Sequence, residues 1–250
     1  MSGHSKWSQI KRQKGAADVK RGQVFTKLGR EITIAVREGG PEPDGNPRLR
    51  QIIQRAREAS MPMDTIDRAI KRAVGGGDGA ALEEITYEGY GPGGAAVLVE
   101  ALTHNRNRAV AEVRSAFTRA GGSLGESGCV AWLFEPRGVI AIENADRDPD
   151  ELGLLAIDAG AEDVRMEDSV VEVLTQPAEL DAVRTALEAE GVKVASAESA
   201  LVPKTTVPLD EKQAGATLRL MEKLEDLDDV QRVYTNLELS EAALAAYQAD

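Results

Sequence analysis

The chain has 250 residues, of which 42% are hydrophobic and 29% are charged, an ordinary globular composition that argues against wholesale disorder. No apolar run approaches the roughly 20 residues that span a bilayer, so no membrane partner is expected, and the N-terminus lacks the apolar core of a secretory signal. The single cysteine, Cys129, excludes an intramolecular disulfide and favours a reducing cytoplasmic location. With only two histidines besides, the sequence gives no reason to expect a metal or another cofactor.

Charge is unevenly distributed along the chain. Residues 1–75 hold 16 Lys and Arg against 8 Asp and Glu, a net charge of +8, whereas the remaining residues hold 14 against 34, a net charge of −20. The densest basic stretch, residues 4–30, contains eight cations and one acid, Asp18. A cluster of this sign is the electrostatic footprint of a polyanionic partner, and the alternative is a solvated basic leader.

The basic third divides into an arm and a helical domain. Residues 1–19 contain little that can be buried, so we expect a flexible basic arm. Residues 20–75 show apolar stripes with a 3.6-residue period, which predict three helices. The first covers 21–38, the second is capped by Asn46, and the third is capped by Asp64. Three helices of this length can bury one another's stripes as a small bundle.

A glycine-rich linker at residues 75–80 marks the first domain boundary. The pattern beyond it alternates between strands and helices. A strand, a helix and a second strand are predicted at 95–102, 106–120 and 129–134. Residues 138–202 then follow the order βαββαβ, which is a complete ferredoxin-like unit.

The elements before this unit form only half of a sheet domain, and a later helix at 210–229 and strand at 230–239 supply the missing half. A linear order of three domains is the alternative, but it leaves two incomplete sheets with open edges. We therefore predict a multidomain α+β fold, in which an N-terminal three-helix bundle is followed by two ferredoxin-like α+β domains, one inserted in the other. The split domain would comprise residues 81–135 plus 204–239, and the inserted domain residues 136–203.

The sequence offers little for catalysis, and we expect no enzyme. Gly89, Gly91 and Gly94 match the spacing G-x-G-x-x-G, but they lie in a predicted loop that a strand follows, and Pro92 intervenes. A dinucleotide site requires a helix at that point, so a structural turn is the better interpretation. Cys129 lies in an apolar segment and is better read as a small core residue than as a nucleophile.

The candidate nucleic-acid contacts are the cations of the basic segment, one aromatic residue among them, and two arginines at a helix start. They are Lys6, Trp7, Lys11, Arg12, Lys14, Lys20, Arg21, Lys27, Arg106 and Arg108. The aromatic residue could stack on a base, or fold back onto the bundle as an anchor. The two arginines lie beside free backbone N–H groups that favour phosphate, or they point into water or pair with the acidic surface.

Several motifs spread over nearly the whole chain resemble the YebC/PmpR family: GHSKW at 3–7, KRGQVFTKLGREI at 20–32, NPRLR at 46–50, YEGYGPGG at 87–94 and NRNRAVAEVR at 105–114. The resemblance implies a helical N-terminal domain plus two α+β domains and no catalytic residues. Members are described as probable DNA-binding transcriptional regulators. Mitochondrial relatives are translational activators of cytochrome oxidase synthesis, and some bacterial members resemble ribosome-associated factors that assist synthesis through proline-rich stretches.

We therefore predict a non-enzymatic, nucleic-acid-binding regulator of gene expression, a monomeric DNA-binding transcriptional regulator that recognises promoter DNA. The alternative is a translation factor on the ribosome that binds ribosomal RNA and assists synthesis of proline-rich stretches. The helices show no obvious helix-turn-helix recognition element, which weakens the DNA hypothesis. Composition cannot separate the two, because DNA and RNA present the same phosphates.

Overall fold

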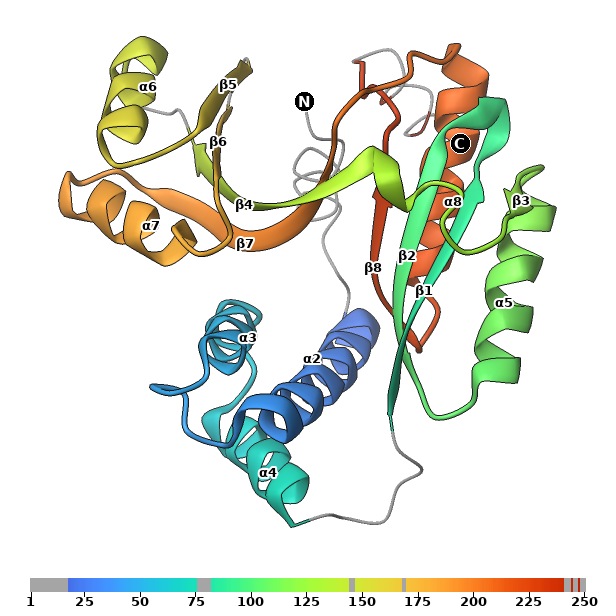
Figure 1. Ribbon diagram of the computed structural model, residues 1–250, viewed down its shortest axis with the longest axis horizontal. Helices are drawn as coiled ribbons and strands as arrows, with labels where there is room; N and C mark the ends of the chain where they lie inside the picture. Colours follow the sequence, from blue (N-terminus) through green and yellow to red (C-terminus); the bar gives the residue numbers. More distant parts are fainter. Residues whose placement is uncertain are drawn as a thin grey trace.

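The computed structural model describes residues 18–75, 82–143, 147–167 and 170–240, together with Leu244 and Tyr247. Its first part is a bundle of three helices, α2 (Asp18–Gly39), α3 (Pro47–Glu58) and α4 (Met63–Val74) (Figure 1). Ile32, Leu49 and Ile66 are fully buried where the three apolar stripes meet. The predicted three-helix bundle is therefore confirmed. Among the described residues, no helix is both long and apolar enough to cross a bilayer.

The starts of α3 and α4 show where cap prediction succeeds and fails. The side chain of Asn46 accepts a hydrogen bond from the Leu49 backbone N–H at 3.0 Å, which confirms it as the N-cap of α3. Its amide group also donates to the carbonyl oxygen of Ala35 at 2.7 Å, so this cap ties α3 to α2. The cap predicted at Asp64 is wrong, because the N-cap is Pro62 and α4 begins at Met63, two residues before the predicted start. Asp64 lies inside the first turn, where its charge still suits the helix dipole.

The second domain is built from two separate parts of the chain. Its sheet has the strand order β3-β1-β2-β8, with all neighbours antiparallel, and β8 pairs with β2 in the register Val97↔Thr235. The elements are β1 (Glu83–Tyr90), β2 (Ala96–Thr103), α5 (Arg106–Arg119), β3 (Ser123–Leu124), α8 (Glu211–Glu225) and β8 (Val230–Thr235). The returning helix and strand thus complete the sheet, as the sequence predicted.

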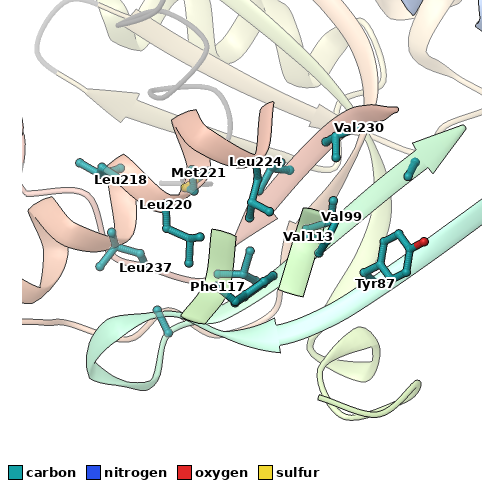
Figure 2. Packing of buried hydrophobic residues seen from close by; sticks show 14 of the residues in the cluster. Tyr87, Val99, Val113, Phe117, Leu218, Leu220, Met221, Leu224, Val230 and Leu237 are labelled. Carbon is teal, nitrogen blue, oxygen red and sulfur yellow. The ribbon is translucent and has the colours of Figure 1, made fainter. Parts of the chain in front are cut away.

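Helices α5 and α8 cover one face of this sheet (Figure 2). Phe117 from α5 and Leu218 from α8 are fully buried in the core between them and the strands, and Tyr247 packs into the same core with 4% of its surface exposed. Gly89 of β1 passes so close to the ring of Phe117 that a Cβ atom there would lie 2.8 Å from it. The glycine is required by this close approach, in agreement with a structural role for the glycine-rich segment.

Two segments of this domain differ from the prediction. The loop expected around Gly89 begins as strand β1, and only Pro92–Gly94 form a 3₁₀ turn before β2. The strand predicted at 129–134 is wrong, because Ala131–Leu133 form a 3₁₀ turn and the next strand starts at Phe134. The cause is Glu88, whose buried carboxylate accepts hydrogen bonds from three backbone N–H groups between residues 128 and 131. The chain wraps around that carboxylate and cannot extend.

The inserted domain has the ferredoxin-like order. Its sheet is β5-β6-β4-β7, and its two helices pack on one face around Ile140, Leu152 and Leu180. The elements are β4 (Phe134–Glu143), α6 (Pro149–Asp158), β5 (Asp163–Glu167), β6 (Val170–Thr175), α7 (Leu180–Ala189) and β7 (Val194–Pro203). With this domain between β3 and α8 in chain order, the predicted fold class of a bundle plus two α+β domains, one inserted in the other, is confirmed.

The two sheet domains share a hydrophobic core. Leu98 and Tyr234, on the face of the second domain's sheet that α5 and α8 leave uncovered, are 2% and 1% exposed. They pack in one cluster with Val139, Leu174 and Val202 of the insert. The insert is therefore attached by packing as well as by its two chain connections.

Candidate nucleic-acid interface

A groove of about 730 Å³ runs between α2 and α4, which cross in the bundle (Figure 1). Its basic lining residues are Arg30, Arg37, Arg68, Arg72 and His104. None of the described residues that line it is acidic, although the protein as a whole carries a net charge of −12. A groove with four arginines and no carboxylate among its described lining residues attracts anions.

The spacing of residues along the two helices explains why these side chains share one groove. Arg30, Thr33 and Arg37 follow one another at intervals of three and four residues on α2, and Thr65, Arg68 and Arg72 do the same on α4. Residues at these intervals lie on one side of a helix. From Arg30 to Arg37 the helix rises about 10 Å, which is roughly three nucleotide steps along one DNA strand.

Two of the arginines are held by the protein, and two are open to a ligand. Arg68 donates to the carbonyl oxygen of Asp64 at 3.0 Å and to the hydroxyl oxygen of Thr65 at 3.1 Å. Arg30 donates to a carboxylate oxygen of Asp229 at 3.1 Å. Arg37 and Arg72 are exposed and make neither an ion pair nor a side-chain hydrogen bond with any described residue. Arg37 and Arg72 can therefore contact an incoming anion without breaking an ion pair with a described residue.

The remaining lining residues leave room for a close approach. Nothing lies within 4 Å of the position that a Cβ atom on Gly29 would occupy, so the wall of the groove is open there. Phe25, partly buried against the bundle core, supplies an aromatic side chain to the same groove. An aromatic ring among arginines is the combination that stacks on nucleobases while the cations hold phosphates.

Asp229 fixes one end of the groove to the second domain. Its carboxylate is 2% exposed and accepts hydrogen bonds from the Thr103 hydroxyl at 2.8 Å and from the Arg108 guanidinium at 2.7 Å, besides the contact with Arg30. Burial raises the pKa of Asp229, but these hydrogen bonds and the two positive charges outweigh it and hold the pKa below its usual range. The residue after Thr103 is His104, which lines the groove.

The contacts predicted in the basic arm fall mainly outside the described residues. Lys6, Trp7, Lys11, Arg12 and Lys14 lie outside them, as does the side chain of Lys20, and their role stays a prediction.

Arg21 and Lys27 are described on α2. Arg21, the fourth residue of the helix, is exposed. The Lys27 ammonium group donates to the carbonyl oxygen of Glu225, at the C-terminal end of α8, where the helix dipole favours a cation. Lys27 thus lies at the contact between the bundle and the second domain.

Arg106 and Arg108 begin α5, as predicted. Arg106 is exposed. The side chain of Arg108 is 51% exposed and is paired with Asp229 and, at 4.0 Å, with Glu112. The structure thus gives Arg108 the acidic partners that one of the two sequence interpretations considered. A contact of either arginine with nucleic acid stays a prediction.

Sequence reasoning did not select the arginines of the groove. Arg37, Arg68 and Arg72 lie outside the dense stretch 4–30, and their charges are diluted along the chain by neighbouring acids. The available signal was the recurrence of arginine and threonine at helical spacing on two different helices. It becomes a site only when the packing of α4 on α2 is known.

The fold and the groove together define a class of protein, in which a helical bundle with a cationic groove is joined to two antiparallel-sheet α+β domains. The family model described as "TACO1/YebC protein N-terminal domain" matches residues 5–76, and that described as "TACO1/YebC second and third domain" matches residues 82–237. The chain belongs to the TACO1/YebC family, which confirms the resemblance seen in the sequence.

Relatives resemble the chain over almost its full length. A "Probable transcriptional regulatory protein" of Desulfosudis oleivorans is 54% identical over 242 residues, which cover 97% of this chain and 98% of the relative. A protein of Roseiflexus castenholzii with the same description is 57% identical over 245 residues, 96% of each chain. The crystal structure of the conserved hypothetical protein Aq1575 from Aquifex aeolicus has a TM-score of 0.81 and 47% identity, covering 90% of this chain and 93% of that one.

Proposed function

We propose that this protein is a non-enzymatic, DNA-binding regulator of transcription, acting as a monomer in the cytoplasm, and that its α2–α4 groove holds the DNA backbone. The observation that carries the proposal is the lining of that groove, whose described residues include four arginines and no acidic residue in a protein of net charge −12. The names of the relatives as probable transcriptional regulatory proteins support the choice of DNA and of transcription.

Arginine suits this role because its planar guanidinium group can donate two parallel hydrogen bonds to a phosphate. Arg37 and Arg72 are the residues with donors to spare, whereas the donors of Arg68 and Arg30 that contact the protein fix the direction of those side chains. Contacts of this kind give affinity and register, and they do not by themselves read sequence. We therefore expect the groove to bind DNA of any sequence with a strong dependence on salt.

The test measures binding of a fluorescent duplex DNA by anisotropy over a range of salt concentrations. For two lost phosphate contacts, the double variant Arg37→Ala with Arg72→Ala should reduce the slope of log K against log salt by about 1.8. The matched control is Arg57→Ala with Arg114→Ala, which removes two exposed arginines outside the groove and the same amount of charge. Equal losses in the two double variants would show a bulk charge effect and contradict the proposal.

A second arm of the same experiment separates DNA from RNA. Structured ribosomal RNA replaces the duplex at matched ionic strength and matched phosphate concentration. The proposal predicts that duplex DNA competes at least as well as the RNA for the groove. If the RNA binds more tightly, and this binding weakens in the Arg37→Ala and Arg72→Ala variant but not in the control variant, the groove remains the site and DNA is overturned as its partner.

A further inference from the structure

A second groove, of about 790 Å³, lies between α5 and α8, on the face of the second domain's sheet opposite the insert. We call it the α5–α8 trench. Its apolar lining consists of alanines from both helices together with Leu220 and Leu227. Leu220 is 1% exposed and belongs to the domain core, so the trench has the core itself as its floor. Alanine side chains at its sides allow another backbone to come close.

The charges on the trench run against those of the domain that carries it. The two parts of that domain, residues 81–135 and 204–239, contain 9 cations and 15 acids. Three of these cations, Arg119, Arg219 and Lys223, line the trench with one acid, Glu112. That acid already has a partner, because its carboxylate lies 4.0 Å from Arg108. The trench is therefore an apolar channel with a cationic rim in a domain that carries more acids than cations. A partner of matching form is apolar along one side and acidic along its flanks.

The dimensions of the trench indicate the conformation of that partner. Its α5 wall runs from Ala111 to Ala120, and its α8 wall runs from Ala216 to Leu227, a little beyond the end of the helix. The nine residue steps of the α5 wall correspond to about 14 Å, or between two and three helical turns. A third helix laid between two helices on a sheet presents apolar residues at positions i, i+3, i+4 and i+7.

We propose that the α5–α8 trench is a docking site for an acidic amphipathic helix of a partner protein. The apolar face of that helix covers the alanine and leucine lining, and its carboxylates meet Arg119 and Lys223, which are exposed at the rim. The site is distinct from the α2–α4 groove in residues and in chemistry, since the groove between α2 and α4 is lined by four arginines.

The test uses a fluorescent helical peptide of about 14 residues, matched to the trench length, with Leu and Met on one face and Glu on both flanks. A second peptide carries Lys at every Glu position. The acidic peptide should bind the full chain, and the basic one should bind at least roughly tenfold more weakly, because its flanks meet like charges. The variant Arg119→Glu with Lys223→Glu should reverse this preference.

The matched control is Arg114→Glu with Lys212→Glu, which makes the same change of charge at exposed positions of the two helices outside the trench. It should leave the preference for the acidic peptide intact. A further variant, Ser115→Trp, fills the trench and should abolish binding of both peptides, with circular dichroism confirming the fold. Failure of the acidic peptide to bind, equal binding of the two peptides, or equal effects of the two charge reversals would overturn the proposal.

Discussion

Deletion of residues 136–203 tests whether the split domain folds without its insert. Glu135 of β4 and Val202 of β7 are paired neighbours, so the cut ends lie on adjacent strands and a short Gly/Ser link can join residue 135 to residue 204. The sheet of the second domain, β3-β1-β2-β8, keeps its four strands, and its core under α5 and α8 loses no residue. We therefore expect the shortened chain to fold.

The shared core sets how much stability the deletion removes. Leu98 and Tyr234 are almost fully buried against the insert and become exposed on an open sheet face. Burial of one such side chain is worth about 1.5–3 kcal/mol, so the two together account for about 3–6 kcal/mol, as an upper estimate. Since whole domains are stable by only about 5–15 kcal/mol, the product should be folded but close to its stability limit.

Urea unfolding followed by circular dichroism measures this loss, with size-exclusion chromatography as a check for association through the exposed face. Leu98→Thr in the shortened chain makes that face more polar and should reduce association, because threonine suits an exposed strand. A shortened chain that is unfolded with and without Leu98→Thr would refute the split domain as a self-sufficient unit. A urea midpoint equal to that of the full chain would refute the energetic role of the shared core.

Two further outcomes follow from the buried carboxylate of Glu88 and from the start of α5. Burial raises the pKa of Glu88, but hydrogen bonds from the backbone N–H groups of residues 128–131 outweigh it and hold the pKa below its usual value. This stabilisation is therefore present above the unfolded-state pKa of about 4.3, and it is lost as the pH falls through the lower folded-state value. Glu88→Gln should lower the urea midpoint at neutral pH. In acid, the midpoint of the variant should fall less steeply with pH than that of the unchanged chain, and an equal fall in both would contradict this. Replacing Arg106 and Arg108 by Ala should reduce the salt slope of DNA binding less than Arg37→Ala with Arg72→Ala does, because Arg108 is already paired with Asp229. A reduction of that slope by about 1.8, as for two lost phosphate contacts, would make both arginines DNA contacts.

The parts of the fold that could be predicted are those with a strong local period. The bundle helices have apolar stripes every three or four residues, and Asn46 before Pro47 is a cap signal that the structure confirms. The insertion was predictable for a different reason, since an incomplete sheet leaves open edges and the late strand β8 was available to close it.

Strand β1 escaped prediction because its pattern is mainly polar. Its apolar alternation is short, since only Ile85 and Tyr87 alternate with polar residues and pack into the core, and two exposed glutamates precede them. Its strand state comes from pairing with β2, which is a long-range contact. The error at 129–134 has a similar origin, because the apolar letters CVAWLF predict a strand while a distant carboxylate, Glu88, bends the chain. Long-range contacts of this kind decide local structure against propensity.

The arginine groove could not be predicted as a site, because its two walls meet only through packing. Thr33 and Arg37 on α2 and Arg68 and Arg72 on α4 are more than 30 residues apart in sequence. Each wall alone reads as an ordinary solvated helix face. A search of the sequence for clustered cations therefore selects the N-terminal stretch. It misses the groove arginines, which come together only when α4 packs on α2.

The acidic net charge of the chain and the basic groove are compatible, because contacts with the second domain occupy the cations on the side of α2 that faces that domain. Arg30 is paired with Asp229, and Lys27 donates to the end of α8, so the cations of α2 that face the second domain are occupied. Arg37 and Arg72, on the outer side, form no ion pair with any residue in the part of the chain that the structure describes. At physiological salt, charges interact over about 8 Å, so a polyanion meets attraction at the groove and repulsion near the acidic domains. For the DNA that we propose as the partner, the same charge distribution favours an orientation with the groove toward the DNA and the acidic domains away from it.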